Sequence, residues 1–279
     1  MTLPLERVVG LLESVAPLAL AEPWDNVGLL LEPLADRRDA KLAPRVGRVL
    51  FTIDFTEAVL TEALASEIDL VVAYHPVLFK PQRRLTRATA AERVLVGAVR
   101  GGLAVYSPHT ALDAAENGLN DWLSLGVGAG ERLPLVPAAA GAGAPASRAG
   151  VGRGVTLAQP SSLAQLVGQL KAHLGRPALR VAATPAHRAG APVQRIAFCA
   201  GSGRGVFERA PGFELYVTGE LSHHDVEALL ATGASVVLGE HSSSERGFLP
   251  VFADRLRALS GDALETLVAS SDREPLEVW

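Results

Sequence analysis

Several short polar clusters follow predicted strands, and the first of them contains a histidine that could bind a metal. Tyr74-His75-Pro76 comes directly after the apolar run 69–73. Because proline stops strand pairing and turns the chain, His75 is expected to project from the carboxyl end of the strand. A histidine with a purely structural role explains this cluster equally well when it is taken alone.

The second cluster runs from Ser107 to Asp113 and follows a strand that ends at Tyr106. His109 and Asp113 are four residues apart, so one helical turn would bring both onto the same face. A carboxylate that loses its water needs a cation or several hydrogen-bond donors, since unpaired burial is costly. A solvated turn is the simpler explanation of this cluster alone.

The third cluster pairs His241 with Glu245 after the predicted strand 236–238. The spacing of four residues at the start of a helix points both groups to one side, where they can chelate a metal ion. The serines at 242–244 and Glu245 are also typical of a helix N-terminus, where they cap the first turn and oppose the helix dipole. Both interpretations can hold at once.

The fourth cluster, within Thr218–His224, places Glu220 close to the doubled histidines His223 and His224. It could supply a further metal ligand, a general acid or base, or groups that orient the ligands. Glu220 and His223 are the catalytic candidates, with surface helix capping as the alternative.

Considered together, the strongest candidate ligands share one chemical property: they offer nitrogen and carboxylate donors without any thiolate. This donor set suits Zn²⁺, Mn²⁺, Fe²⁺ or Co²⁺ in a hydrolytic site better than structural zinc. Carboxylates can also bridge two ions, and paired ions could activate water against a phosphate or a ring carbon. The predicted ligands are His75, Asp113, His241 and Glu245.

The composition narrows the class of protein. The 279 residues are 48% hydrophobic and carry a net charge of −4, which argues against a protein that grips a nucleic-acid backbone. The single cysteine, Cys199, excludes an intramolecular disulfide and an all-thiolate metal site. With no secretory signal or apolar span evident, we expect a soluble cytoplasmic protein that does not act at membranes.

The elements that must position these clusters alternate between strand and helix patterns. This alternation predicts an α/β fold of two lobes, with mainly parallel sheets covered by helices. We expect an N-terminal lobe over 1–136, an Ala/Gly/Pro-rich loop or linker over 137–150, and a C-terminal lobe over 151–279. The final helix is predicted over 244–260 from its amphipathic spacing.

Five motifs spread over nearly the whole chain resemble the NIF-three-like family, the group also named GTP cyclohydrolase 1 type 2 homologue. The Tyr-His-Pro form of the first histidine motif looks more like the eukaryotic branch of that family. The motifs are Trp24-Asp25-Asn26-Val27-Gly28-Leu29, Tyr74-His75-Pro76, His109-Thr110-Ala111-Leu112-Asp113, Thr218-Gly219-Glu220 with His223-His224, and Glu240-His241-Ser242 through Glu245-Arg246-Gly247-Phe248-Leu249.

The resemblance implies an α/β/α protein with a dinuclear metal site in the cleft between two lobes, and trimers that assemble into a ring-shaped homohexamer. The four ligands named above would hold two divalent ions per subunit, with Asp113 and Glu245 as the bridging groups. Many bacterial members have a histidine where this chain has Tyr74. A neutral tyrosine is a poor ligand, so Tyr74 is a doubtful one, and this departure from the family pattern predicts that one metal is bound more weakly or is absent.

The function implied by the resemblance is that of a metal-dependent hydrolase acting on a nucleotide or phosphoester. A GTP cyclohydrolase activity would open the guanine imidazole ring by hydrolysis, with His223 or Glu220 transferring protons. His109 and His224 are further candidates for orienting ligands or moving protons. The alternative is a non-catalytic metal-binding or protein-interaction protein, such as a transcriptional co-regulator.

Overall fold

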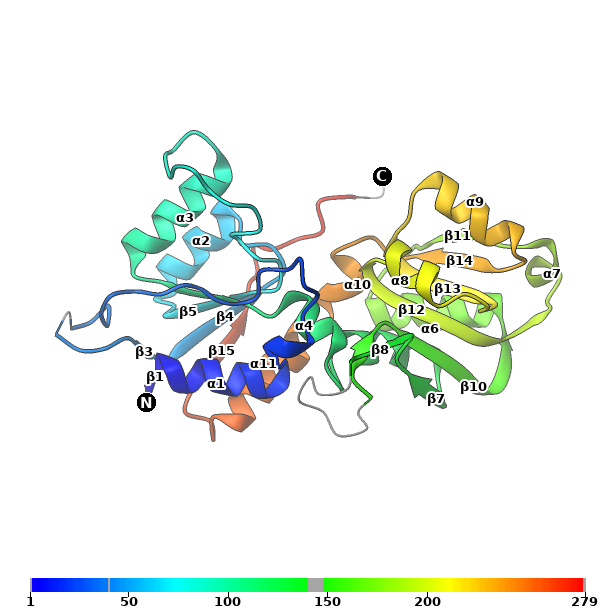
Figure 1. The fold of residues 1–279 in the computed structure, drawn as a ribbon, viewed down its shortest axis with the longest axis horizontal. Helices are drawn as coiled ribbons and strands as arrows, with labels where there is room; N and C mark the ends of the chain where they lie inside the picture. Colours follow the sequence, from blue (N-terminus) through cyan, green and yellow to red (C-terminus); the bar gives the residue numbers. More distant parts are fainter. Residues whose placement is uncertain (1, 40, 140–147, 278–279) are drawn as a thin grey trace. The chain divides into compact units, whose positions relative to one another are not determined.

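The computed structural model describes residues 2–39, 41–139 and 148–277, which form two compact units. Unit 1 comprises the chain up to Leu112 together with Leu249–Pro275, and unit 2 comprises Asp113–Phe248 with the residues from Leu276 onward. Figure 1 labels the elements of each unit. Among the described residues, no helix is both long enough and apolar enough to span a bilayer.

Unit 1 is built on a five-stranded sheet in the order β15-β4-β5-β6-β2. The pairs β15–β4, β4–β5 and β5–β6 are parallel, and only β2 runs antiparallel to its neighbour β6. A short antiparallel pair, β1 with β3, lies outside this sheet. The strands are β1 (Leu3–Pro4), β2 (Gly28–Leu31), β3 (Arg45–Val46), β4 (Arg48–Thr52), β5 (Leu70–Ala73), β6 (Ala104–Ser107) and β15 (Glu265–Val268).

Helices cover both faces of this sheet, with α2 and α3 on one side and α1 and α11 on the other (Figure 1). The α2–α3 side buries Val59 and Val94 against Val71 and Val105 of the sheet. Thr56 caps α2 through a hydrogen bond accepted from the Val59 amide, as its sequence position predicts. The helical elements are α1 (Leu5–Val15), η1 (Leu18–Leu20), α2 (Glu57–Ala65), α3 (Ala90–Gly101), α4 (His109–Ala114) and α11 (Leu249–Leu259).

Unit 2 contains a six-stranded mixed sheet in the order β11-β14-β13-β12-β10-β7. Only β12–β13 and β13–β14 are parallel, so the expectation of mainly parallel sheets is wrong for this unit. Antiparallel neighbours need no helical crossover, and no helix is described between β7 and β10. The strands are β7 (Gly130–Leu133), β10 (Arg153–Ser162), β11 (Arg180–Ala182), β12 (Pro192–Ser202), β13 (Leu215–Glu220) and β14 (Ser235–Leu238).

The helices of unit 2 include two that connect its parallel strands, α8 between β12 and β13 and α9 between β13 and β14. Ser222 caps α9 in a capping box with Asp225, and Ser162 caps α6 in the same way with Gln165. The helical elements are α5 (Leu119–Ser124), η2 (Leu125–Val127), α6 (Leu163–Leu174), α7 (Pro185–Arg188), α8 (Arg204–Arg209), α9 (His223–Ala231) and α10 (Ser243–Arg246).

The Ala/Gly/Pro-rich segment 137–150 does not mark the division between the two units. Its described ends belong to β8 (Val136–Pro137) and β9 (Gly150–Val151), which pair with each other antiparallel, while residues 140–147 lie outside the described residues. The chain instead passes from unit 1 to unit 2 at Leu112–Asp113 and returns at Phe248–Leu249. The change in composition at this segment therefore does not locate the boundary between the two units, because the segment begins and ends within unit 2.

The helix predicted over 244–260 is two helices, α10 and α11, separated at Gly247 and Phe248. A side chain at Gly247 would lie 2.4 Å from the ring of Trp122, so only glycine permits this close approach. Pro250 has no amide hydrogen and is tolerated only in the first turn of a helix, which is where it lies in α11. The apolar spacing alone does not reveal the break.

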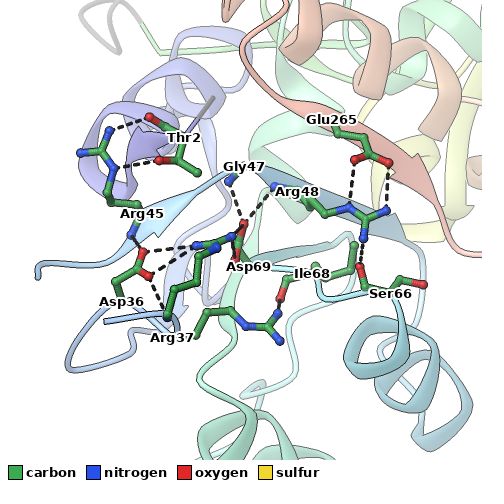
Figure 2. Close-up of polar contacts among 11 residues, drawn as sticks. Thr2, Asp36, Arg37, Arg45, Gly47, Arg48, Ser66, Ile68, Asp69 and Glu265 are labelled. Carbon is green, nitrogen blue, oxygen red and sulfur yellow. Dashed lines mark hydrogen bonds and ion pairs between the residues drawn. The ribbon is translucent and has the colours of Figure 1, made fainter. Parts of the chain in front are cut away.

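The Asp69 carboxylate, 3% exposed, joins the starts of β4 and β5 (Figure 2). It accepts hydrogen bonds from the amides of Gly47 (2.7 Å) and Arg48 (3.0 Å) and from Arg38 Nη2 (2.6 Å). The Arg48 guanidinium in turn donates to Glu265 at the start of β15. A buried carboxylate with several donors and a guanidinium partner stabilises the register of these three strands.

Candidate metal centre

The candidate residues of unit 1 gather at one edge of its sheet. Strands β4, β5 and β6 are parallel, so their carboxyl ends meet, and they are followed by Asp54, His75 and His109 respectively. His75 Nδ1 lies 2.9 Å from Asp54 Oδ1, and the rings of His75 and His109 are 5.5 Å apart between centroids. His75 therefore projects at the carboxyl edge, as predicted from its position after the strand.

Asp25 holds His109 in place from a distant part of the chain. Its side chain is fully buried, with Oδ1 2.8 Å from His109 Nδ1 and Oδ2 accepting from the Thr110 amide (3.1 Å) and hydroxyl (2.5 Å). Burial alone would raise the pKa of Asp25, but the hydrogen bonds from His109 and Thr110 outweigh it and leave the pKa below its ordinary value. Asp25 is thus ionised and fixes the orientation of the His109 ring.

Tyr74, the doubtful ligand, is 2% exposed and packs against both histidines of this edge. Its ring centroid lies 5.1 Å from that of His75 and 5.5 Å from that of His109. Its carbonyl oxygen accepts a hydrogen bond from the Ser107 hydroxyl at 2.8 Å, which ties the ends of β5 and β6 together. These contacts give Tyr74 a packing role at the candidate centre.

Unit 2 repeats this arrangement at the carboxyl ends of its three parallel strands. Gly201 lies near the end of β12, Glu220 ends β13, and His241 follows β14. The His241 ring lies between two carboxylates, with Nδ1 3.1 Å from Glu220 Oε1 and Nε2 3.4 Å from Glu245 Oε1. A carboxylate at Nδ1 favours the proton on that nitrogen, which leaves the Nε2 lone pair for a metal.

Gly201 brings the backbone close to this histidine and carboxylate pair. With φ at +61°, a Cβ at this position would lie 2.6 Å from Glu245 Oε1 and 3.1 Å from His241 Nε2. The Gly201 amide donates to the Ser244 hydroxyl (2.9 Å), and its carbonyl accepts from the Thr218 hydroxyl (3.0 Å). Only glycine fits both the conformation and the space. A buried carboxylate (2% exposed) beside an imidazole nitrogen is a donor set that fits a divalent metal ion.

Asn120 ties the backbone of Asp113 to the end of β12. Asn120 donates from Nδ2 to the Asp113 carbonyl (3.1 Å) and accepts from the Ala200 amide (2.9 Å), which connects α4 to the end of β12. Burial raises the pKa of the Cys199 thiol, and the negative charges of Asp113 and Glu245 raise it further. Both carboxylates therefore lie within electrostatic reach of this one buried cysteine.

The second catalytic candidate, His223, follows Glu220 by three residues along the chain. It is the exposed first residue of α9, where its ring lies 5.4 Å from that of His224 between centroids. Among the described residues, neither His223 nor His224 forms a hydrogen bond with Glu220, Glu245 or Asp113. Their position is typical of a helix start in solvent.

By donor type, His75 of unit 1 is a possible metal ligand, and so are His241 and Glu245 of unit 2. Sequence reasoning missed Asp54 and Asp25, the carboxylates that hold Nδ1 of His75 and His109. The signal for Asp54 was its position directly after a buried strand of the same parallel sheet. Asp25 lies 84 residues from His109 in the sequence, and nothing local connects the two.

Comparison with known proteins decides the family. Residues 3–275 match the family described as Duf34/NIF3 (NGG1p interacting factor 3). The chain belongs to the Duf34/NIF3 family. NIF3-like protein 1 of Drosophila melanogaster is 38% identical over 272 residues, which cover 98% of this chain and 88% of the relative. NGG1-interacting factor 3 of Saccharomyces cerevisiae is 35% identical over 280 residues, with coverage of 98% and 96%.

Solved structures agree with the NIF3 fold. A Bacillus cereus protein related to NIF3 has a TM-score of 0.83 at 18% identity, over 98% of each chain. Reduced HcgD from Methanocaldococcus jannaschii has a TM-score of 0.77 at 22% identity, over 97% of this chain and 99% of that one. At these identities the likeness shows the shared mixed α/β fold. The resemblance to the family that the motifs indicate is confirmed.

Replacing Gly201 by alanine should disrupt the His241–Glu245 pair. We expect a loss of about 1–3 kcal/mol of stability, because the added Cβ is strained at positive φ and collides with Glu245. Divalent metal affinity should fall as well. Thermal unfolding with EDTA and metal analysis of the purified protein measure the two effects. Gly205→Ala is the matched control, since a Cβ there meets no heavy atom within 4 Å, and unchanged metal content in Gly201→Ala would contradict the expectation.

The Asp25 carboxylate should make stability depend on pH. Its pKa in the folded protein is below the ordinary value of 3.8, so its stabilisation is complete above that value and is lost as pH falls through the folded pKa. Asp25→Asn should therefore be destabilised at pH 7, with a difference from wild type that shrinks in acid. Urea unfolding at pH 7, 5 and 3.5 measures this, with the exposed Glu32→Gln as control. A difference that is the same at every pH would refute it.

Proposed function

We propose that this NIF3-family protein is a metal-dependent hydrolase that acts on a nucleotide or phosphoester substrate. In this proposal His75, Asp113, His241 and Glu245 hold two divalent ions. The observation that supports it best is the His241 ring, whose Nδ1 faces Glu220 and whose Nε2 faces the buried Glu245. A carboxylate that orients a histidine ligand through Nδ1 is a recurring feature of protein metal sites.

The donor set agrees with a hydrolytic centre more than with a structural one. It consists of imidazole nitrogens and carboxylate oxygens, whereas structural zinc sites rely largely on thiolates. Divalent ions held by these residues would supply Lewis-acid polarisation of a phosphoryl group or a ring carbon. Tyr74 adds no anionic donor in this scheme, because a neutral phenol is a poor ligand.

The roles of the neighbouring side chains follow from their contacts. Glu220 orients His241 through its contact with Nδ1, so in this proposal it is a positioning residue. Asp54 does the same for His75. His109, fixed by the ionised Asp25 and adjacent to the His75 ring, is better placed than His223 to move a proton to or from a substrate. Assembly into a ring-shaped hexamer and a cytoplasmic location remain predictions.

Variants at His241 test the proposal. We expect His241→Ala and Glu245→Gln to lose bound metal and at least 100-fold of any hydrolysis, because both remove a ligand. Glu220→Gln should keep the ligands but bind metal about 10–100-fold more weakly. Metal analysis and turnover of GTP and of bis(4-nitrophenyl) phosphate measure these effects, with the exposed His224→Ala as control. Metal-free wild-type protein, or activity that is unchanged in His241→Ala, would refute the proposal.

A second candidate function is a non-catalytic protein-interaction role. It is favoured by the name of the yeast relative, NGG1-interacting factor 3, which is 35% identical to this chain. Under this alternative the metal centre would have a structural or metal-handling role. Finding a substrate with a turnover of about 1 per second or faster would count against it.

A further inference from the structure

Two large aromatic rings lie exposed beside the histidines of unit 1. Trp24 is 60% exposed and Phe79 49% exposed, and their centroids are 6.0 Å apart with the ring planes at 78°. Both also lie near His109, at 6.1 Å for Trp24 and 6.4 Å for Phe79. Adjacent exposed aromatic surface is unfavourable in water and is typical of sites that bind another molecule.

Hydrogen bonds hold the chain on either side of these rings. Asn26 Nδ2 donates to the carbonyl of Leu78 at 2.5 Å, which joins the residue two after Trp24 to the residue before Phe79. Asp25, between Trp24 and Asn26, is the fully buried carboxylate that holds His109. The two rings are therefore presented by chain segments that are joined to each other and to the candidate acid–base histidine.

A cationic segment follows Phe79 directly. Lys80, Arg83, Arg84 and Arg87 all lie in exposed positions, and the next acidic residue along the chain is Glu92. Within the described part of the chain, none of these four side chains forms an ion pair with a carboxylate. Glu92 itself is engaged by the Thr86 hydroxyl and the Ala88 amide. Unpaired cations beside an aromatic pair attract a ligand that is both planar and anionic.

We propose that Trp24 and Phe79 form a stacking platform for the heteroaromatic ring of a mononucleotide, whose phosphate is bound by Lys80 and Arg83. This inference rests on the proposed function, since it names the substrate class of the same site. We infer a ligand with an aromatic ring because the faces of Trp24 and Phe79 are exposed. We infer a phosphate because the cations that follow Phe79 have no carboxylate partner among the described residues. Trp24 and Phe79 meet edge to face and so can stack with a single base. Proteins that bind single-stranded nucleic acids instead have several aromatic side chains, on which successive bases stack.

Calorimetric titration of metal-free protein with AMP, GMP, adenosine and ribose 5-phosphate tests the platform separately from hydrolysis. Trp24→Ala and Phe79→Ala should each raise the Kd for AMP about 5- to 150-fold, which is the range expected for the loss of one stacking contact. Both should leave the weak binding of ribose 5-phosphate unchanged. Trp24→Phe should restore most of the affinity, since it keeps a ring.

Removing the cations should weaken the binding of the phosphate and leave the binding of the base unchanged. Lys80→Ala combined with Arg83→Ala should raise the Kd for AMP but not for adenosine, because only AMP carries a phosphate. Val99→Ala is the control for removing an exposed apolar side chain of the same unit, since Val99 is 60% exposed on α3, and it should bind AMP like wild type.

Three results would overturn the platform. The first is a Kd for AMP that is unchanged in both Trp24→Ala and Phe79→Ala. The second is a change of oligomeric state in these variants with nucleotide affinity intact, which would make the rings a subunit interface. The third is affinity that rises steadily with the length of an oligonucleotide, which would indicate a polymer. If nucleotides bind as expected while His241→Ala leaves activity unchanged, the hydrolase fails and the binding site stands.

Discussion

The arrangement of the candidate centre depends on the close approach of the Gly201 backbone to the His241–Glu245 pair. At φ +61° the chain leaves β12 in a conformation that L side chains rarely adopt, and a Cβ would lie only 2.6 Å from the buried carboxylate. The hydroxyls of Thr218 and Ser244 hold this turn from β13 and α10. The His241 and Glu245 side chains therefore pack directly against the Gly201 backbone, where a larger residue would displace them.

The candidate functional side chains are arranged in the same way in both units. Three adjacent parallel strands end at a common edge, and a histidine after a strand is oriented by a carboxylate at its Nδ1. In unit 1, Asp54 orients His75 and Asp25 orients His109, while in unit 2 Glu220 orients His241. Three histidines held in this way lose little freedom when they bind a ligand or move a proton, which supports a role in chemistry over a purely structural one.

Local signals in the sequence predict the helices, the strands and the candidate metal ligands. They predict less well which distant side chains contact those ligands and the other site residues. Thr56 as a helix cap and the four-residue spacing of His241 and Glu245 are short-range features, and the structure contains both. The contact of Asp25 with His109 spans 84 residues and depends on the tertiary fold. The same is true of the close packing of Gly247 against the Trp122 ring, and of the antiparallel strands that make the second sheet mixed.

The central claim is that His241 Nε2 and Glu245 share a metal ion while Glu220 holds the other ring nitrogen. Anomalous diffraction at the zinc edge, from crystals grown with Zn²⁺, tests this most directly. The account predicts a peak about 2.0–2.2 Å from His241 Nε2 and from a Glu245 carboxylate oxygen, with Glu220 still at Nδ1. A full-occupancy zinc bound elsewhere, with His241 and Glu245 paired only to each other, would contradict it.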